Sequence, residues 1–229
     1  MAFNLDNVVP WGRSHDEYIN MFALDNDDLK KRILGCGDGP ASFNCCLTRQ
    51  DGSVISVDPI YRFTAEEIAD RIDETYDIVM EQTKQNLDEF IWTVIGSVEE
   101  LGEVRKKAMS AFLADYPEGV SEGRYVTSEL PNLPFPDGTF DLALCSHFLF
   151  LYSEHFDASF HLQSLRELCR VAHEVRVFPI VELGSVRSRH VDEVVSRLEM
   201  EGFEVCIKRV AYEFQKGGNE MLCVKLPLE

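Results

Sequence analysis

Short apolar runs alternate along this chain with longer stretches of helical periodicity, and this alternation limits the possible folds more than any other feature. Short runs that are apolar throughout are typical of parallel strands buried on both faces. With helical segments between them, they predict an α/β protein with a mostly parallel sheet. The turn at Lys216-Gly217-Gly218-Asn219 predicts a final antiparallel hairpin. The expected strands are 32–34, 53–58, 124–128, 140–146, 174–180, 203–210 and 220–225.

The connection between the second and third expected strands is unusually long. Residues 64–123 are almost all helix-forming, whereas one crossover helix takes roughly 10–15 residues. We therefore expect a helical insert at about 64–123, within a single domain that spans residues 1–229.

The charge balance excludes several classes of partner. The 229 residues include 22 Lys and Arg against 40 Asp and Glu, which gives a net charge of −18. Duplex nucleic acid and anionic membranes are bound by clustered cations, so neither is expected as a partner. No segment has the pattern of a signal peptide or a membrane span, which predicts a cytoplasmic protein. The seven cysteines lack metal-ligand spacing, so no metal site is expected.

The strongest local signal is a glycine-rich turn after the first expected strand. Its glycines are Gly35, Gly37 and Gly39, and a helix is expected to start at Pro40. Glycines let a ligand approach the backbone closely, and a helix N-terminus favours negative charge. Asp58 ends the next strand, where a carboxylate can accept both hydroxyls of a ribose. A dinucleotide fingerprint would need Gly or Ala where Pro40 stands, which counts against an NAD-dependent oxidoreductase.

Three segments resemble the class I S-adenosylmethionine-dependent methyltransferases. They are RILGCGDGPASF at 32–43, SVDP at 56–59 and SELPNLPFPDGTFDLALCSHFL at 128–149. The opening VVPWGRSHDEY, together with GCGDGPASFN, is also similar to a group of uncharacterised bacterial methyltransferase-like proteins. The resemblance covers about two thirds of the chain. It implies a Rossmann-like, seven-stranded, mostly parallel sheet with one antiparallel C-terminal strand, and S-adenosylmethionine as the cofactor.

The resemblance also implies where the cofactor lies. The glycine turn would line its methionine part, Asp58 would hold the ribose, and Glu129 and Leu130 would meet the adenine. One position departs from the family pattern, because Ile33 stands where an acidic residue usually anchors the amino end of the cofactor. Asp38, inside the turn, is either a substitute for that residue or a surface side chain. The cofactor-binding residues expected in this way are Gly35, Cys36, Gly37, Gly39, Asp58, Pro59, Glu129, Leu130 and Ser146.

The candidates for catalysis and substrate binding are fewer. His147 is the candidate general base, because imidazole titrates near neutral pH, and the alternative is a histidine that only lines the pocket. Arg13 is either a carboxylate ligand or half of a surface ion pair. Tyr18 follows a capping box at Ser14 and Glu17 and is either a lid or a core contact. The other candidates are Tyr152, in the cleft or the core, and Trp92, in the wall and lid of the acceptor pocket or in a homodimer contact.

The predicted function is methyl transfer from S-adenosylmethionine to a small molecule or a protein side chain. No N/D-P-P-Y/F motif follows the fourth expected strand, which disfavours amino methylation of nucleic-acid bases. A non-catalytic binding or scaffolding protein with the same fold stays open because of Ile33. An NAD-dependent oxidoreductase is the less favoured third possibility.

Overall fold

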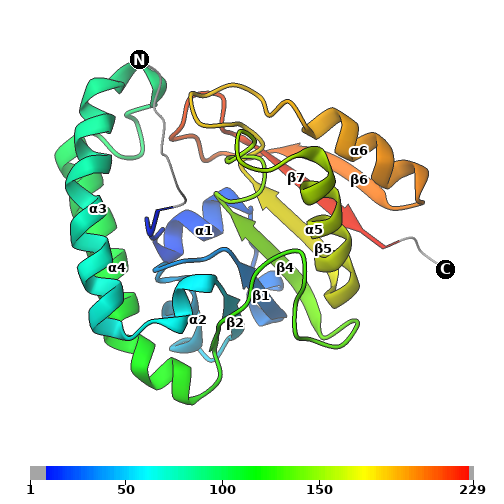
Figure 1. Cartoon of the computed structure of the whole chain (residues 1–229), viewed down its shortest axis with the longest axis horizontal. Helices are drawn as coiled ribbons and strands as arrows, with labels where there is room; N and C mark the ends of the chain where they lie inside the picture. Colours follow the sequence, from blue (N-terminus) through cyan, green and yellow to red (C-terminus); the bar gives the residue numbers. More distant parts are fainter. Residues whose placement is uncertain (1–8, 227–229) are drawn as a thin grey trace.

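A seven-stranded sheet with helices on both faces forms the centre of the protein (Figure 1). The computed structural model describes residues 9–226. The strand order is β3-β2-β1-β4-β5-β7-β6, and β7 runs antiparallel to both β5 and β6. This confirms the expected seven-stranded, mostly parallel sheet with an antiparallel C-terminal strand. The strands are β1 (Arg32–Cys36), β2 (Ser53–Val57), β3 (Tyr125–Val126), β4 (Phe140–Ser146), β5 (Ala172–Phe178), β6 (Glu204–Arg209) and β7 (Glu220–Lys225).

Helices cover each face of the sheet and extend beyond one side of it. On one face lie α1 (His15–Met21) and α2 (Phe43–Thr48), and on the other lie α5 (Ala158–Val171) and α6 (Val191–Met200). The expected insert consists mainly of two long helices, α3 (Ala65–Gln85) and α4 (Val98–Ser121), which stand side by side as a wall in Figure 1. Short 3-10 helices are η1 (Asp28–Lys30), η2 (Pro59–Arg62) and η3 (Leu87–Glu89).

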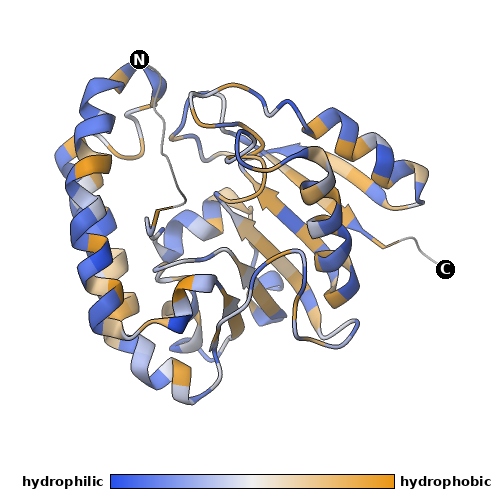
Figure 2. Cartoon of the chain, in the orientation of Figure 1, coloured by the Kyte–Doolittle hydropathy of each residue, from blue (hydrophilic) through white to orange (hydrophobic). Residues whose placement is uncertain are grey.

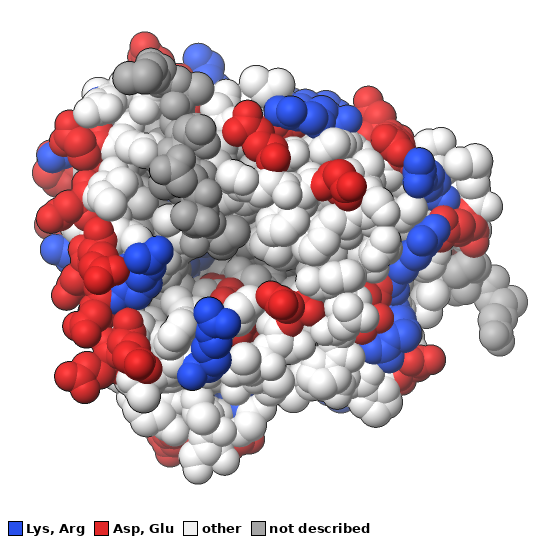
Figure 3. Space-filling view, viewed as in Figure 1, with Lys and Arg blue, Asp and Glu red and all other residues white. Residues whose placement is uncertain are grey.

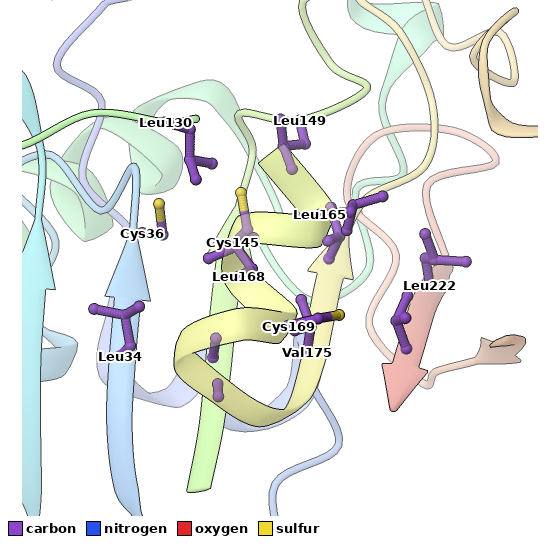
Figure 4. Close-up of a cluster of buried hydrophobic side chains, with 14 of the residues drawn as sticks. Leu34, Cys36, Leu130, Cys145, Leu149, Leu165, Leu168, Cys169, Val175 and Leu222 are labelled. Atoms are coloured by element: carbon purple, nitrogen blue, oxygen red, sulfur yellow. The ribbon is translucent and has the colours of Figure 1, made fainter. Parts of the chain in front are cut away.

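The central strands β1, β4 and β5 are mostly apolar (Figure 2) and are buried on both faces, as their continuous apolar runs predict, whereas the edge strand β6 is mostly exposed. Successive side chains point to opposite faces, so Leu142 and Leu144 pack under α1 and α2 while Ala143 and Cys145 pack under α5. Figure 4 shows the second of these layers, where Leu165 and other α5 side chains meet the sheet. Burial of these two layers fixes the register of the central strands.

Two local expectations were wrong. Helix α2 begins at Phe43 rather than at Pro40, because residues 37–42 are used in a wider turn in which Gly39 has φ +51°. The expected antiparallel hairpin of β6 and β7 is confirmed. Val210 N–H donates to Asn219 O at 2.8 Å, and the residues between them form a loop that reaches the insert. The second wrong expectation concerns the third strand, which is reduced to Tyr125–Val126.

The insert is attached to the sheet by an aromatic cluster. Helix α3 starts with a capping box in which Thr64 and Glu67 bond each other's backbone N–H. Phe112 and Tyr116 of α4 pack against Tyr61 and Tyr125, and the Tyr116 hydroxyl donates to Tyr61 O at 2.8 Å. The acidic side chains gather on the outer side of this wall (Figure 3). The insert thus packs against Tyr125 of β3, at the edge of the sheet, and against Tyr61 of η2, and exposes its charged face to solvent.

A buried ion pair holds the insert to the opposite part of the chain. Arg105 of α4 has 0% of its surface exposed, and its guanidinium donates to both carboxylate oxygens of Glu17 in α1, at 2.5 and 2.7 Å. The Tyr212 hydroxyl, from the β6–β7 loop, donates to the same carboxylate at 2.8 Å. Arg105 and nearby Arg13 hold the pKa of Glu17 far below its usual range despite burial. Three distant segments therefore meet at one carboxylate.

Replacing Arg105 by Met should destabilise the protein strongly, because Glu17 would remain buried without its cation. Breaking a buried pair from one side typically costs about 3–5 kcal/mol. Urea unfolding measures the loss, and the double variant Glu17→Gln/Arg105→Met should recover part of it. Arg197→Met, in the exposed pair with Glu193 on α6, is the control and should have a far smaller effect. Equal effects of Arg105→Met and Arg197→Met would contradict the assignment.

Candidate active site

A cavity of about 620 Å³ lies at the carboxyl ends of β1, β2 and β4, where ligands bind in open α/β sheets. Figure 3 shows this face hollowed between the helical wall and the sheet. Its floor includes Cys36, Val57 and Ser146, the last residues of the three strands. Most of the residues predicted from sequence line it, namely Arg13, Tyr18, Cys36, Gly37, Gly39, Asp58, Pro59, Glu129, Leu130, Ser146, His147 and Tyr152.

The glycine turn is shaped by close packing around it. Gly37 has φ +68°, and a Cβ there would lie 3.0 Å from Phe148 Cβ. A Cβ on Gly35 would lie 1.8 Å from a carboxylate oxygen of Asp38. Gly35 is therefore needed to admit the Asp38 side chain and is not among the cavity-lining residues.

Asp38 is buried in the turn without a cation beside it. One of its oxygens accepts from the Tyr18 hydroxyl at 2.7 Å and the other from the Ser56 hydroxyl at 2.6 Å. Burial raises the pKa of Asp38 to about 6, and the nearby charge of Asp58 adds to the rise. Asp38 is thus held in the turn by two hydroxyls and lines the cavity, so it is not a surface side chain.

Asp58 follows β2 and is held by the backbone. Its two oxygens accept from Gly39 N–H and Ile60 N–H, each at 2.9 Å. Burial raises its pKa to about 6, and the two backbone hydrogen bonds oppose that rise. Each carboxylate oxygen keeps a further lone pair, so the group can still accept two hydroxyls from a ligand. Glu129 and Leu130 line the cavity further along, after β3.

Ser146 and His147 stand at the end of β4. The Ser146 hydroxyl and His147 Nδ1 are 2.9 Å apart, and His147 N–H donates to Phe178 O at 2.7 Å. His147 has φ +52°, an uncommon conformation for this residue that is often found at functional sites. Burial, with the charges of Arg13 and Arg105, holds its pKa well below the ordinary value. His147 is therefore a neutral imidazole that lines the cavity.

The roof of the cavity joins the insert to the β6–β7 loop. Ile91 N–H donates to Phe214 O at 2.7 Å, and Lys216 N–H donates to Glu89 O at 2.8 Å. The rings of Phe90 and Phe214 stack with their centroids 5.0 Å apart, and both line the cavity. The apolar roof and the apolar side chains beneath it suit a ligand with an apolar body.

Trp92 does not line the cavity itself. It packs edge-on against Phe214 with the ring centroids 5.4 Å apart, and its indole N–H donates to Leu87 O at 3.1 Å. Trp92 thus supports the roof through Phe214. The sequence singled out Trp92 but missed Phe90 and Phe214, because an aromatic in a loop carries no periodic signal and their pairing is long-range.

No cluster of three or more His, Cys, Asp or Glu side chains that could hold a metal ion occurs among residues 9–226. Within the same residues, no helix is long and apolar enough to cross a membrane.

The strand order and the cavity at its switch point define a protein with the class I methyltransferase fold. No family model matches the chain. Uncharacterized protein MJ0045 of Methanocaldococcus jannaschii is 30% identical over 223 residues, which are 97% of this chain and 98% of that protein. The chain belongs to the same family as this archaeal protein.

Solved structures with a similar fold are much more distant in sequence. Magnesium protoporphyrin IX methyltransferase from Synechocystis PCC 6803, solved with bound SAM, is 12% identical, with a TM-score of 0.48 over 93% of this chain and 77% of that chain. A SAM-dependent methyltransferase from Aquifex aeolicus is 16% identical, with a TM-score of 0.43 over 92% of this chain and 87% of that chain. At these scores neither similarity bears on the function of this chain.

The two buried carboxyls should make stability depend on pH in an identifiable window. The pKa values of Asp38 and Asp58 are about 6 in the folded protein, against about 3.9 in an unfolded chain. The folded state therefore binds more protons between these values, and the free energy of unfolding should fall as pH rises from 4 to 7. Each carboxyl contributes up to about 1.4 kcal/mol per pH unit within this window.

Asp38→Asn removes one of these groups while keeping an acceptor for Tyr18, so its stability should depend less steeply on pH. Urea unfolding at several pH values between 4.5 and 7.5 measures the slope. The exposed Asp192 provides the control, and Asp192→Asn should keep the parent's slope. An unchanged slope in Asp38→Asn would show that Asp38 titrates normally.

Proposed function

We propose that this protein is an S-adenosylmethionine-dependent methyltransferase that acts on a small molecule. The observation that carries the proposal is one continuous cavity extending from Asp58, across the glycine turn, to His147. Asp58 is oriented by two backbone N–H groups and keeps the lone pairs that a ribose diol requires. Gly37 and Gly39 leave the backbone open to a ligand between those two ends.

The residues present fit this cofactor at three places. Asp58 would hold the ribose, Glu129 and the Leu130 backbone would meet the adenine, and Gly37 would face the methionine part. S-adenosylmethionine supplies an activated methyl group, so proximity and alignment account for most of the acceleration. The protein is then required to orient the acceptor, to exclude water and, for some acceptors, to remove a proton.

His147 is the residue placed to remove that proton. A hydrogen on Nδ1 would be donated to the Ser146 hydroxyl, which leaves the lone pair on Nε2. No hydrogen bond to Nε2 is present among the described residues. The low pKa of His147 keeps the imidazole neutral near pH 7, the form in which it accepts a proton.

The acceptor side of the cavity favours a small molecule over a protein side chain. Phe90 and Phe214 line it, and their segments are joined by two backbone hydrogen bonds. Tyr152 and Leu183 add further apolar surface to the same cavity. A cavity lined mainly by apolar side chains suits a compact ligand, whereas a protein segment would need an extended groove.

Cofactor binding should depend on Asp58. Asp58→Ala removes two hydrogen bonds to a charged acceptor, each worth about 1.5–3 kcal/mol. The affinity for S-adenosylhomocysteine should therefore fall at least about tenfold. Titration calorimetry measures it, and Asp192→Ala on the surface is the control. No binding by the parent protein would favour the non-catalytic scaffold, and binding of NAD instead would favour the oxidoreductase.

Methyl transfer should depend on His147 if the acceptor must lose a proton. His147→Gln keeps a group that can bond Ser146 but cannot act as a base, and transfer should fall by about 10²–10⁴-fold. Transfer is followed with methyl-labelled S-adenosylmethionine and a small-molecule extract. Cofactor affinity should stay close to that of the parent. Undiminished transfer by His147→Gln would limit this residue to lining the pocket.

A further inference from the structure

Arg13 carries a positive charge into the cavity, and no carboxylate of residues 9–226 forms an ion pair with it. Its Nη1 donates to Trp11 O at 2.7 Å, and its Nε is buried with no partner among the described residues. Guanidinium has five N–H donors, and leaving a buried charged donor unpaired is costly. The side chain thus has binding capacity that the folded chain does not use.

The nearest acidic group is already occupied. Glu17 binds Arg105 through both oxygens and also accepts from the Tyr212 hydroxyl. One carboxylate near two guanidinium groups leaves a net positive charge. In agreement with this, burial and the charge of Arg105 lower the pKa of Arg13 to about 10. A ligand carboxylate in the cavity would balance that charge.

The backbone of Arg13 is fixed against the glycine turn. Gly12 packs so closely that a Cβ there would lie 2.1 Å from Pro40 O, and Ser42 N–H donates to Arg13 O at 3.0 Å. Arg13 lines the cavity together with Tyr18 and Gly37. Ribose binding at Asp58 and adenine binding at Glu129 would leave this end of the cavity for the amino-acid part of the cofactor.

The resemblance places an acidic anchor for the ammonium group at position 33, and that position is apolar here. Ile33 is 1% exposed and belongs to the apolar core beneath α1 and α2. Asp38 lines the cavity and accepts one hydroxyl on each oxygen, so each oxygen keeps a further lone pair that an ammonium group could use. The carboxylate of the amino-acid part is then left to the Arg13 guanidinium.

We propose that Arg13 binds the carboxylate of the methionine part of S-adenosylmethionine and so holds the amino-acid end of a cofactor for which position 33 supplies no acidic anchor. This inference rests on the proposed function. A guanidinium suits the role because it can donate two parallel hydrogen bonds to a carboxylate.

Comparing the affinities of three ligands isolates the contribution of the cofactor's carboxylate to binding. S-adenosylhomocysteine carries both the ammonium and the carboxylate, its decarboxylated analogue keeps only the amine, and 5′-methylthioadenosine lacks both. Calorimetry with the parent should show tighter binding of S-adenosylhomocysteine than of either other ligand. In Arg13→Met, S-adenosylhomocysteine should lose about ten- to a hundredfold in affinity, the range for a charge-assisted hydrogen bond. The affinities for the other two ligands should stay the same.

The controls distinguish a binding role from a structural one. Arg62 also lines the cavity, and its guanidinium stacks 4.7 Å above Phe63, so Arg62→Met tests the general effect of removing a cation. Arg62→Met should keep the parent's preference for S-adenosylhomocysteine, and Arg13→Lys should keep part of it. The unchanged affinity of Arg13→Met for 5′-methylthioadenosine also shows that the variant is folded.

Two results would overturn the inference while leaving the proposed function intact. Arg13→Met could weaken all three ligands equally, which would mark a structural role, or it could leave the preference for S-adenosylhomocysteine unchanged. An unchanged preference is also the result expected if Arg13 binds a carboxylate of the acceptor instead of that of the cofactor. If the parent bound none of the three ligands, both the inference and the proposed function would fail.

Discussion

The buried ion pair between Glu17 and Arg105 fixes the relative positions of three segments that lie far apart in sequence. Glu17 belongs to the N-terminal helix, Arg105 to the insert, and Tyr212 to the loop before the last strand. Buried charges are costly to desolvate, so a pair of this kind persists only where the geometry satisfies both partners. The cavity lies among these three segments, and its shape depends on their being held together. Because Glu17 is taken up by Arg105, Arg13 has no ion-pair partner within the part of the chain that the structure describes.

The glycine turn shows how close packing can keep a carboxylate buried beside a ligand site. Gly35 admits the Asp38 side chain, and two hydroxyls donate to it. Asp38 in turn orients Tyr18, which lines the cavity. Burial raises the pKa of both Asp38 and Asp58, so each carboxylate is ionised at neutral pH against a desolvation cost. Hydrogen bonds from a ligand to Asp58 would offset part of that desolvation cost.

The insert distinguishes this cavity from the open crevice that a bare sheet of this topology would present. Its two long helices form a wall, and its turn at Phe90 meets Phe214 above the floor. The chemistry of methyl transfer requires little from the side chains, so this enclosure would select the acceptor. In the proposed function the sheet would supply the cofactor end of the cavity and the insert the acceptor end, so that fold and substrate choice are separable.

Local periodicity and spacing were enough to predict much of the fold and part of the site. The strands and their order along the chain, the helical insert, and the capping box of Ser14 and Glu17 were predicted because each depends on neighbouring residues. The resemblance to the methyltransferases placed Asp58 and His147 in one cleft, and both line the cavity because the carboxyl ends of parallel strands share an edge.

Tertiary structure alone decided the rest. Pro40 suits a helix start, yet the helix begins at Phe43 because the turn uses the intervening residues. Glu17 caps its own helix as predicted, but its pairing with Arg105, 88 residues away, carries no sequence signal. The same holds for the Phe90–Phe214 roof and for the unpaired charge of Arg13. Burial and charge balance depend on everything packed around a group, and that neighbourhood exists only in the folded chain.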